Sequence, residues 1–268
     1  GTAKPTPEEM RGIPHHMLDV ADPEEDFSVA RYVELAAPCV DDILARGKLP
    51  IVAGGTGLYL DSLLSGRTFA PFSPDGGLRA RLEARFDALG GEAMLGELAA
   101  ADPEAAARLH PNDEKRIVRA LEVYLSTGKT ITQHNRETLA LPPRYDALTI
   151  TLAFQRREDM WARIDRRVEE MMERGLAQEV RALLDSGVPE RCTAMQAIGY
   201  KEMAAALRGD GDVDRAAEEI QLRSRQYAKR QLTWFRRNGA AKWITWGSEP
   251  NFAQALQVST GYLEDFGI

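Results

Sequence analysis

The feature that most constrains the fold is the order of four segments within residues 28–64. Apolar residues recur at helical spacing over residues 28–47, and a short apolar run with β-branched residues follows at 49–53. The turn Gly54-Gly55-Thr56-Gly57 then leads directly into a second helical pattern at 58–64. Because helix, strand, glycine turn and helix alternate in this way in parallel sheets, the order predicts an α/β fold in which residues 49–53 form a buried strand.

The rest of the chain divides into a helical block and a second α/β stretch. Residues 69–77 are rich in Pro and Gly and predict a boundary. Helices are expected after it at 78–89, 92–100, 103–109 and 113–127, and strands at 148–153 and 242–246. Between these strands, helices are expected at 159–174, 176–186, 195–207 and 213–237. We therefore expect an α/β core formed by residues 1–70 and 142–268, with a helical insertion domain at 71–141.

Charge is distributed very unevenly along the 268 residues. The chain has 34 Lys plus Arg and 41 Asp plus Glu, a net charge of −7. Residues 220–247 nevertheless contain no acid and seven bases, which are Arg223, Arg225, Lys229, Arg230, Arg236, Arg237 and Lys242. Acid-free basic segments of this kind are typical of a nucleic-acid surface, although a solvated helix face is the ordinary alternative.

Composition also limits the setting of the protein. No apolar run approaches the ~18 residues that a transmembrane helix needs, and no secretory signal pattern is present. Cys39 and Cys192 are the two cysteines, so we expect no disulfide framework, no Cys-x-x-Cys metal or redox motif, and a reducing cytoplasmic location. The four histidines lack metal-ligand spacing, so we assign no metal ligands and no Ser or Cys nucleophile.

The glycine turn is the best local candidate for an anion site. Glycines let a backbone approach a ligand closely, and free N–H groups at the start of a helix attract phosphate. An ordinary strand-to-helix turn capped by Thr56 fits the tetrapeptide equally well. Gly128-Lys129-Thr130 resembles the end of a Walker A loop, but Val123 stands where that motif needs Gly, so Gly128 is interpreted as a helix C-cap.

Two helical patterns add candidate side chains. Over residues 159–174, Arg167 falls within the apolar stripe of Met160, Ile164, Val168 and Met171, where it would need an anion. Either a structural ion pair or a bound phosphate satisfies that need. Over residues 220–237, one face gathers five polar and basic side chains, while the rings of Tyr227, Trp234 and Phe235 interleave as possible stacking partners for bases. The five residues of that face are Arg223, Gln226, Arg230, Thr233 and Arg237.

Taken together, these motifs resemble the bacterial tRNA dimethylallyltransferase family. The resemblance rests on dispersed motifs that run in family order along nearly the whole chain: Gly1-Thr2-Ala3-Lys4-Pro5, Pro14-His15-His16-Met17-Leu18-Asp19, Pro50-Ile51-Val52-Ala53-Gly54-Gly55-Thr56-Gly57-Leu58-Tyr59, His110-Pro111-Asn112-Asp113, Arg119-Ala120-Leu121-Glu122-Val123, Ile198-Gly199-Tyr200-Lys201-Glu202 and Arg225-Gln226-Tyr227-Ala228-Lys229-Arg230-Gln231-Leu232-Thr233-Trp234. The fold that it implies is a P-loop NTPase-like parallel-sheet core with a helical insertion domain.

The resemblance also implies roles for individual residues. Thr56 and Arg167 match catalytic positions, and Gly54, Gly55, Thr56 and Arg167 match diphosphate-binding positions. The family's tRNA-contacting segments fall on Arg79, Lys115, Arg116, Ile117, Val118, Arg119, Gln196, Ala197, Ile198, Gly199, Tyr200, Lys201, Ser224, Arg225, Gln226, Tyr227, Ala228, Lys229, Arg230 and Gln231. For Ile117 and Ala197 a packing role fits as well as an RNA contact.

The implied reaction transfers a dimethylallyl group from dimethylallyl diphosphate to N6 of adenosine 37 in tRNAs that read codons starting with U. Mg²⁺ is the expected cofactor, held mainly by the diphosphate and a phosphate loop, and ATP-type nucleotide binding belongs to the same fold. Family members carry that loop and an Asp-Ser motif, whose Asp is the general base, upstream of the segment that begins here. The chain is therefore expected to be a fragment lacking them. We also expect a monomer that binds the anticodon stem-loop and no membrane.

Three other functions stay open at this point. An adenylate isopentenyltransferase would share the core and the donor but would need neither the basic helix nor the insertion domain. A non-catalytic RNA-binding remnant would bind an anticodon stem-loop without transferring a prenyl group. A P-loop kinase is disfavoured because the Walker lysine is missing from the sequence.

Overall fold

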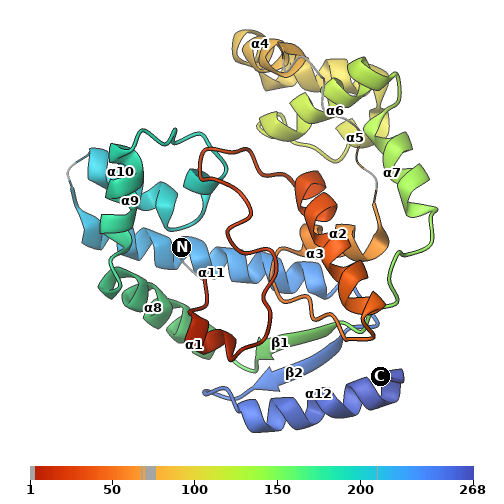
Figure 1. Cartoon of the computed structure of the whole chain (residues 1–268). Coiled ribbons are helices and arrows are strands. Elements are labelled where there is room, and N and C mark those ends of the chain that lie inside the picture. The colour runs from red at the N-terminus through yellow and green to blue at the C-terminus, as the bar shows by residue number, and fades with distance from the viewer. Residues whose placement is uncertain (1–3, 68, 70–76, 210) are drawn as a thin grey trace. The chain divides into compact units, whose positions relative to one another are not determined.

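The computed structural model describes residues 4–67, 69, 77–209 and 211–268 (Figure 1). The chain divides into two compact units, one formed by residues 1–61 and 146–268 and the other by residues 62–145. Most of the turn-rich stretch expected at 69–77 lies outside the described residues, as do the first three residues of the chain. None of the helices in the described part is long and apolar enough to cross a bilayer.

The first unit is built around two parallel strands. Its elements are α1 (Pro7–Met10), α2 (Val29–Ala45), the start of α3 (Gly57–Ser65), β1 (Ile150–Phe154), α8 (Arg157–Glu173), α9 (Leu176–Asp185), the 3₁₀ turn η1 (Ala194–Gln196), α10 (Tyr200–Arg208), α11 (Val213–Phe235), β2 (Lys242–Trp246) and α12 (Phe252–Phe266). Strand β1 pairs with β2 in register from Ile150–Lys242 to Phe154–Trp246. Parallel strands need a long crossover, and helices α8 to α11 supply it. The predicted parallel α/β core and its two later strands are thus confirmed.

Two apolar clusters hold this unit together. Helices α8 to α11 enclose a core that includes Val180, Met195, Met203 and Ile220, all 1% exposed or less. Helix α12 lies alongside the strands in Figure 1 and packs Ala255 against Ile244 and Trp246 of β2. Helix α12 was not predicted, although the Asn251 side chain caps its start by accepting a hydrogen bond from the Gln254 amide.

The expectation of a buried strand at residues 49–53 is wrong. No strand is assigned there, and the side chains of Leu49, Ile51 and Val52 are 44%, 83% and 38% exposed. Among the described residues β1 and β2 are the strands of the sheet, and they pair with each other. Residues 49–53 therefore have no ladder partner in the described structure, and an apolar run without a ladder has neither the hydrogen bonds nor the covering helices that bury a parallel strand.

The second unit is helical. It contains α4 (Gly77–Ala101), α5 (Pro103–Ala106), α6 (Glu114–Thr127) and α7 (Ile131–Leu139). Gly90 interrupts α4 at φ 80°, so the two predicted helices at 78–89 and 92–100 correspond to its two halves. Gly128 ends α6 at φ 72°, which confirms the interpretation of Gly128 as a C-cap. Helix α7 was not predicted, although Thr130 and Gln133 form a capping box at its start.

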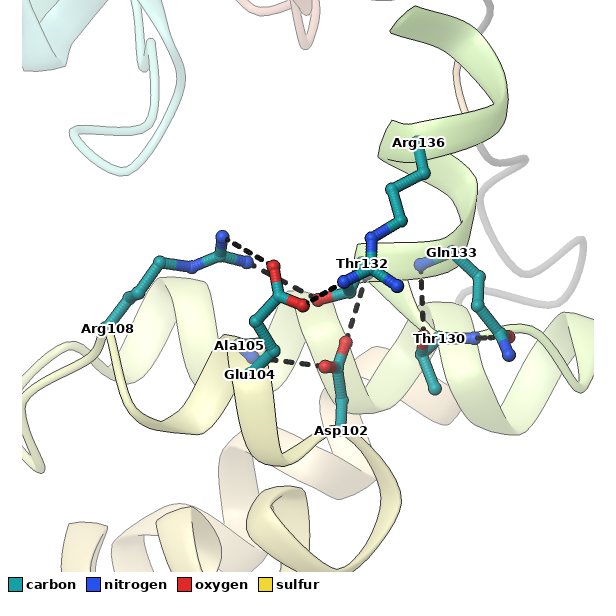
Figure 2. A network of polar contacts seen from close by, with 8 residues as sticks. All are labelled: Asp102, Glu104, Ala105, Arg108, Thr130, Thr132, Gln133 and Arg136. Atoms are coloured by element: carbon teal, nitrogen blue, oxygen red, sulfur yellow. Dashed lines mark hydrogen bonds and ion pairs between the residues drawn. The ribbon is translucent and has the colours of Figure 1, made fainter. Parts of the chain in front are cut away.

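A network around Asp102 joins α5 to α7 in this unit (Figure 2). Asp102 is 3% exposed, and its two carboxylate oxygens accept hydrogen bonds from the backbone amides of Ala105 and Thr132, each at 3.0 Å. Burial disfavours the ionised carboxylate, but these hydrogen bonds outweigh it and lower the pKa of Asp102. The exposed carboxylate of Glu104 pairs with Arg108 and Arg136 above it. Asp102 is therefore a structural acid that fixes both helix starts.

Candidate nucleic-acid and diphosphate site

Helix α11 presents its predicted basic face to solvent. Arg223, Gln226, Arg230, Thr233 and Arg237 are all exposed, as their helical spacing predicts. Arg223 pairs with Glu219 of the same helix at 2.6 Å, which offsets part of its charge. Lys229 and Arg236 are exposed as well. The C-terminal half of α11 therefore carries cations that a phosphate backbone could reach.

A neighbouring face of α11 holds the glycine turn. Gln231 Nε2 donates to the Gly55 carbonyl oxygen at 2.9 Å, and the Tyr227 hydroxyl lies 3.2 Å from Thr56 Oγ1. Trp234 Nε1 donates to Asp61 Oδ2 at 2.8 Å. These three helix positions follow each other at intervals of four and three residues, so they share one face. The prediction that the rings interleave with the charges holds, but in the structure Tyr227 and Trp234 are directed to the turn.

The glycines of the turn allow this close approach. A Cβ atom placed on Gly57 would lie 2.2 Å from Trp234 Cδ1, and one placed on Gly55 would lie 2.0 Å from Gln231 Nε2. Thr56 immediately precedes α3, and its carbonyl accepts hydrogen bonds from the Tyr59 and Leu60 amides. Amide groups in the first turn of a helix lack intrahelical partners and attract anions. The turn therefore fits the diphosphate role predicted for Gly54, Gly55 and Thr56, which stays a prediction.

Arg167 does not lie on a buried stripe, contrary to the prediction. Its side chain is 43% exposed, and its guanidinium pairs with Glu170 at 3.7 Å. Val168 is the fully buried member of the expected stripe, while Arg163 and Arg166 face solvent. Because half-exposed Arg167 needs no anion to offset burial, burial gives no argument for its diphosphate role, which rests on the family resemblance alone. Helix α8 is tied to α11 by Asp165 and Arg225, 3.3 Å apart.

In the helical unit, the predicted RNA-contacting residues fall into two groups. Lys115 and Arg116 are exposed, but Ile117 and Val118 are 0% and 1% exposed and pack the core. The side chains of Ile117 and Val118 therefore do not form an RNA-contacting surface, since the helical periodicity that exposes Lys115 turns them inward. Contacts from this turn would have to come from its basic side chains.

Arg119 and Arg79 converge on one buried acid. Arg119 Nη1 lies 2.8 Å from Glu122 Oε2, and Arg79 Nη1 lies 3.8 Å from the same oxygen. The Glu122 side chain is 2% exposed, and Arg79 also pairs with Glu83 at 3.2 Å. A buried carboxylate needs such partners, so both guanidinium groups are held in place. Sequence reasoning did not single out Glu122.

The segment from Gln196 to Lys201 borders an open groove of about 1060 Å³ between α10 and α11. Gln196, Ala197 and Lys201 are exposed, Ile198 is half-buried, and Gly199 is buried at φ 104°. The Tyr200 hydroxyl donates to Glu179 at 2.6 Å, and burial together with this carboxylate raises the pKa of Tyr200. Arg225 lines the groove, and Ser224 and Ala228 of α11 are half-buried.

The structure therefore brings together some predicted site residues that lie far apart in the sequence. It joins Thr56 to Tyr227 and Gly55 to Gln231, but it also adds Trp234 and Asp61, which were not assigned to the site. The spacing of Tyr227, Gln231 and Trp234 was visible in the sequence, although the partner of that face was not.

In the part of the chain that the structure describes, no group of three or more His, Cys, Asp or Glu side chains could hold a metal ion.

Comparisons with known proteins point to one family. A family model described as IPP transferase matches residues 1–238. A tRNA dimethylallyltransferase from Acetivibrio thermocellus is 42% identical, covering 100% of this chain and 85% of the relative. One from Geobacter sulfurreducens is 45% identical, covering 100% and 84%. These shares do not support the expectation that the chain is a fragment.

Solved structures agree with the sequence relatives. The full-length tRNA isopentenylpyrophosphate transferase from Bacillus halodurans has a TM-score of 0.68 and 38% identity, over 98% of this chain and 83% of that one. A eukaryotic dimethylallyltransferase described as acting on tRNA has a TM-score of 0.78 and 27% identity, over 98% and 68%. Their P-loop NTPase-like core confirms the predicted fold class.

Proposed function

This chain belongs to the IPP transferase family, and from that premise we propose that it transfers a dimethylallyl group from dimethylallyl diphosphate to tRNA. The finer proposal is that the acceptor is N6 of adenosine 37 in tRNAs reading codons that start with U. A cytoplasmic, monomeric enzyme fits this proposal. Both substrates are anionic, and the acceptor base must leave its stack to react.

The observation that carries the proposal is the double role of α11. One face exposes Arg230 and Arg237, which suit an RNA backbone, while the next holds the glycine turn that suits a diphosphate. A transferase needs its two substrates side by side, and a single rigid helix between two such surfaces provides that placement. An RNA-binding remnant would have no need of a diphosphate-type turn fixed from the RNA-facing helix.

The reaction forms a C–N bond between the exocyclic amine and the allylic carbon and breaks the bond from that carbon to the diphosphate oxygen. The diphosphate leaves with the bonding electron pair, so donors around it stabilise the developing charge. The turn amides, the Thr56 hydroxyl and the Arg167 guanidinium are the proposed donors. None of the described residues is assigned as the base that takes the amine proton.

Mg²⁺ stays part of the proposal through the substrate. Because the described residues contain no group of carboxylates or histidines suited to a metal ion, the diphosphate oxygens would carry it. When bound, such an ion would neutralise leaving-group charge. No step above depends on a protein-bound metal.

The test measures transfer from labelled dimethylallyl diphosphate to an anticodon stem-loop by the purified protein. We expect transfer to the stem-loop, and we expect Arg167→Ala to lower its rate about tenfold or more with tRNA affinity unchanged. Arg163→Ala, on the exposed face of the same helix, is the control. Transfer to free adenylate instead would favour an adenylate isopentenyltransferase, and stem-loop binding without transfer would favour an RNA-binding remnant. Loss of tRNA binding in Arg167→Ala would move Arg167 to the RNA surface.

A further inference from the structure

We propose that Gln231 and Trp234 are positioning residues that transmit the binding of RNA on α11 to the glycine turn. This inference rests on the proposed function. Neither side chain needs to touch the reacting atoms. Their role would be to fix the backbone that carries Thr56, so that the turn takes its working geometry when the RNA is in place.

Gln231 and Trp234 of α11 both fit closely against the glycine turn. Gln231 bonds the carbonyl of Gly55, and the Trp234 indole lies so close to Gly57 that no side chain fits between them. The indole N–H is also used, since it donates to Asp61 in the second turn of α3. A ring and an amide together therefore clamp both the turn and the start of the helix that follows it.

The residues that hold the turn are also in contact with the basic face of α11. The Arg230 guanidinium lies over the Tyr227 ring at 5.5 Å, and the Arg237 guanidinium lies over the Trp234 ring at 5.1 Å. Two of the cations that could meet a phosphate, Arg230 and Arg237, thus rest on rings that hold the turn. When RNA fixes these cations, the rings beneath them lose freedom too, and the turn is ordered with them.

Kinetics separate positioning from direct RNA binding. For Trp234→Phe, which loses the indole N–H, and the isosteric Gln231→Glu, which loses the amide donor, we expect kcat to fall about tenfold or more. The Kd for the stem-loop should stay within about twofold. Gly261→Ala and Gln254→Glu on α12 are matched controls, since Gly261 has open space around it and Gln254 is exposed.

Gly57→Ala provides a steric version of the same test. Its new methyl would displace the indole, so we expect a loss of kcat similar to that of Trp234→Phe. Combining Gly57→Ala with Trp234→Leu should cost little more than Trp234→Leu alone, because the ring that clashes is gone. Additive losses in the double variant would contradict the clamp.

Hydrogen exchange gives a readout that does not depend on activity. Adding the stem-loop should slow amide exchange over residues 54–60 in the wild-type protein but not in Trp234→Phe or Gln231→Glu. Equal slowing in the variants, or a fall in RNA affinity that matches the fall in kcat, overturns the proposal and makes Gln231 and Trp234 direct RNA contacts. A wild-type protein that transfers nothing to tRNA would refute the proposed function, while the exchange experiment would still report on the clamp.

Discussion

The basic residues of α11 and the arginine pair on Glu122 were both predicted to contact RNA, but the structure places them in two different environments. Lys229 and Arg230 of α11 are exposed, and Arg230 rests on a ring. Arg79 and Arg119, in the helical unit, converge on a carboxylate that is 2% exposed. Sequence alone presents both groups simply as cations within RNA-contacting motifs.

The two groups would therefore contribute differently to RNA binding, one through long-range charge and the other through the fixed orientation of its guanidinium groups. An exposed cation keeps its full attraction for phosphate, and salt screens that attraction strongly. Arg79 and Arg119, taken with Glu83 and Glu122, form a set without net charge, so they add little long-range attraction. Their guanidinium groups are fixed in space, however, which favours a directional hydrogen bond to one nucleotide over general affinity.

The largest effect is expected from removing the acid that fixes the pair. Glu122→Gln should lower the free energy of unfolding by about 2 kcal/mol, less than the ~3–5 kcal/mol of a fully buried pair because both arginines are partly exposed. Urea denaturation measures this change. Glu83→Gln, which removes an exposed partner of Arg79, should stay within about 0.5 kcal/mol. If Glu122→Gln and Glu83→Gln are equally stable, the ion pairs of Glu122 with Arg79 and Arg119 do not stabilise the fold.

The next effect is expected on RNA affinity from the exposed group. Lys229→Ala combined with Arg230→Ala should weaken stem-loop binding about tenfold at moderate salt and flatten the plot of log affinity against log salt by about 1 to 2 units. Binding titrations between 50 and 200 mM salt measure the slope. Lys48→Ala, an exposed lysine of the same unit, is the control. An unchanged slope would remove the case for α11 as the phosphate-contacting surface.

The held pair should behave differently in the same titrations. Arg119→Ala is expected to weaken stem-loop binding about threefold to tenfold while changing the salt slope by less than about 0.5. Arg85→Ala, which breaks an exposed pair with Glu97 in the same unit, is the matched control. A slope change as large as that of the Lys229 and Arg230 variant would erase the distinction between the two groups.

The smallest effect concerns Asp102, a buried acid held by amides and not by arginines. Because its folded-state pKa lies below the ordinary value of 3.8, its ionised form stabilises the fold above that value. This contribution is lost as pH falls through the lowered pKa. Asp102→Asn should therefore cost about 1 kcal/mol near pH 7, and the difference from wild type should shrink below pH 4. Urea denaturation at pH 7 and pH 3 checks this, and a constant difference would contradict it.

Sequence reasoning predicted the elements whose signals are local. Helices α2, α6 and α11 and both strands have regular spacing or β-branched runs within them, and each lies close to its expected range. Residues 49–53 carry the same local signal as β1 but lack a ladder partner in the described structure, which no local pattern reveals. Helix α7 was missed because seven of its nine residues are polar, although its capping box was readable.

In the candidate site, too, the features with a local sequence signal were predictable and those set by tertiary packing were not. The exposed face of α11 was predictable, since helical periodicity alone places Gln226 and Arg230 together. The clamp on the glycine turn was not, because Gln231 and Gly55 are 176 residues apart and meet only through tertiary packing. Buried Glu122 was missed for the same reason, since one of its two arginine partners, Arg79, lies on α4.

The adjoining faces of α11 also bear on how such a protein can change over generations. Positions 226 and 233 are exposed and can be exchanged to suit another RNA without touching the turn. Gly57 and Trp234 are locked to each other, because any side chain at 57 takes the space of the indole. Substrate preference can therefore drift on one side of the helix, while the pair on the other side can be replaced only by two coordinated changes.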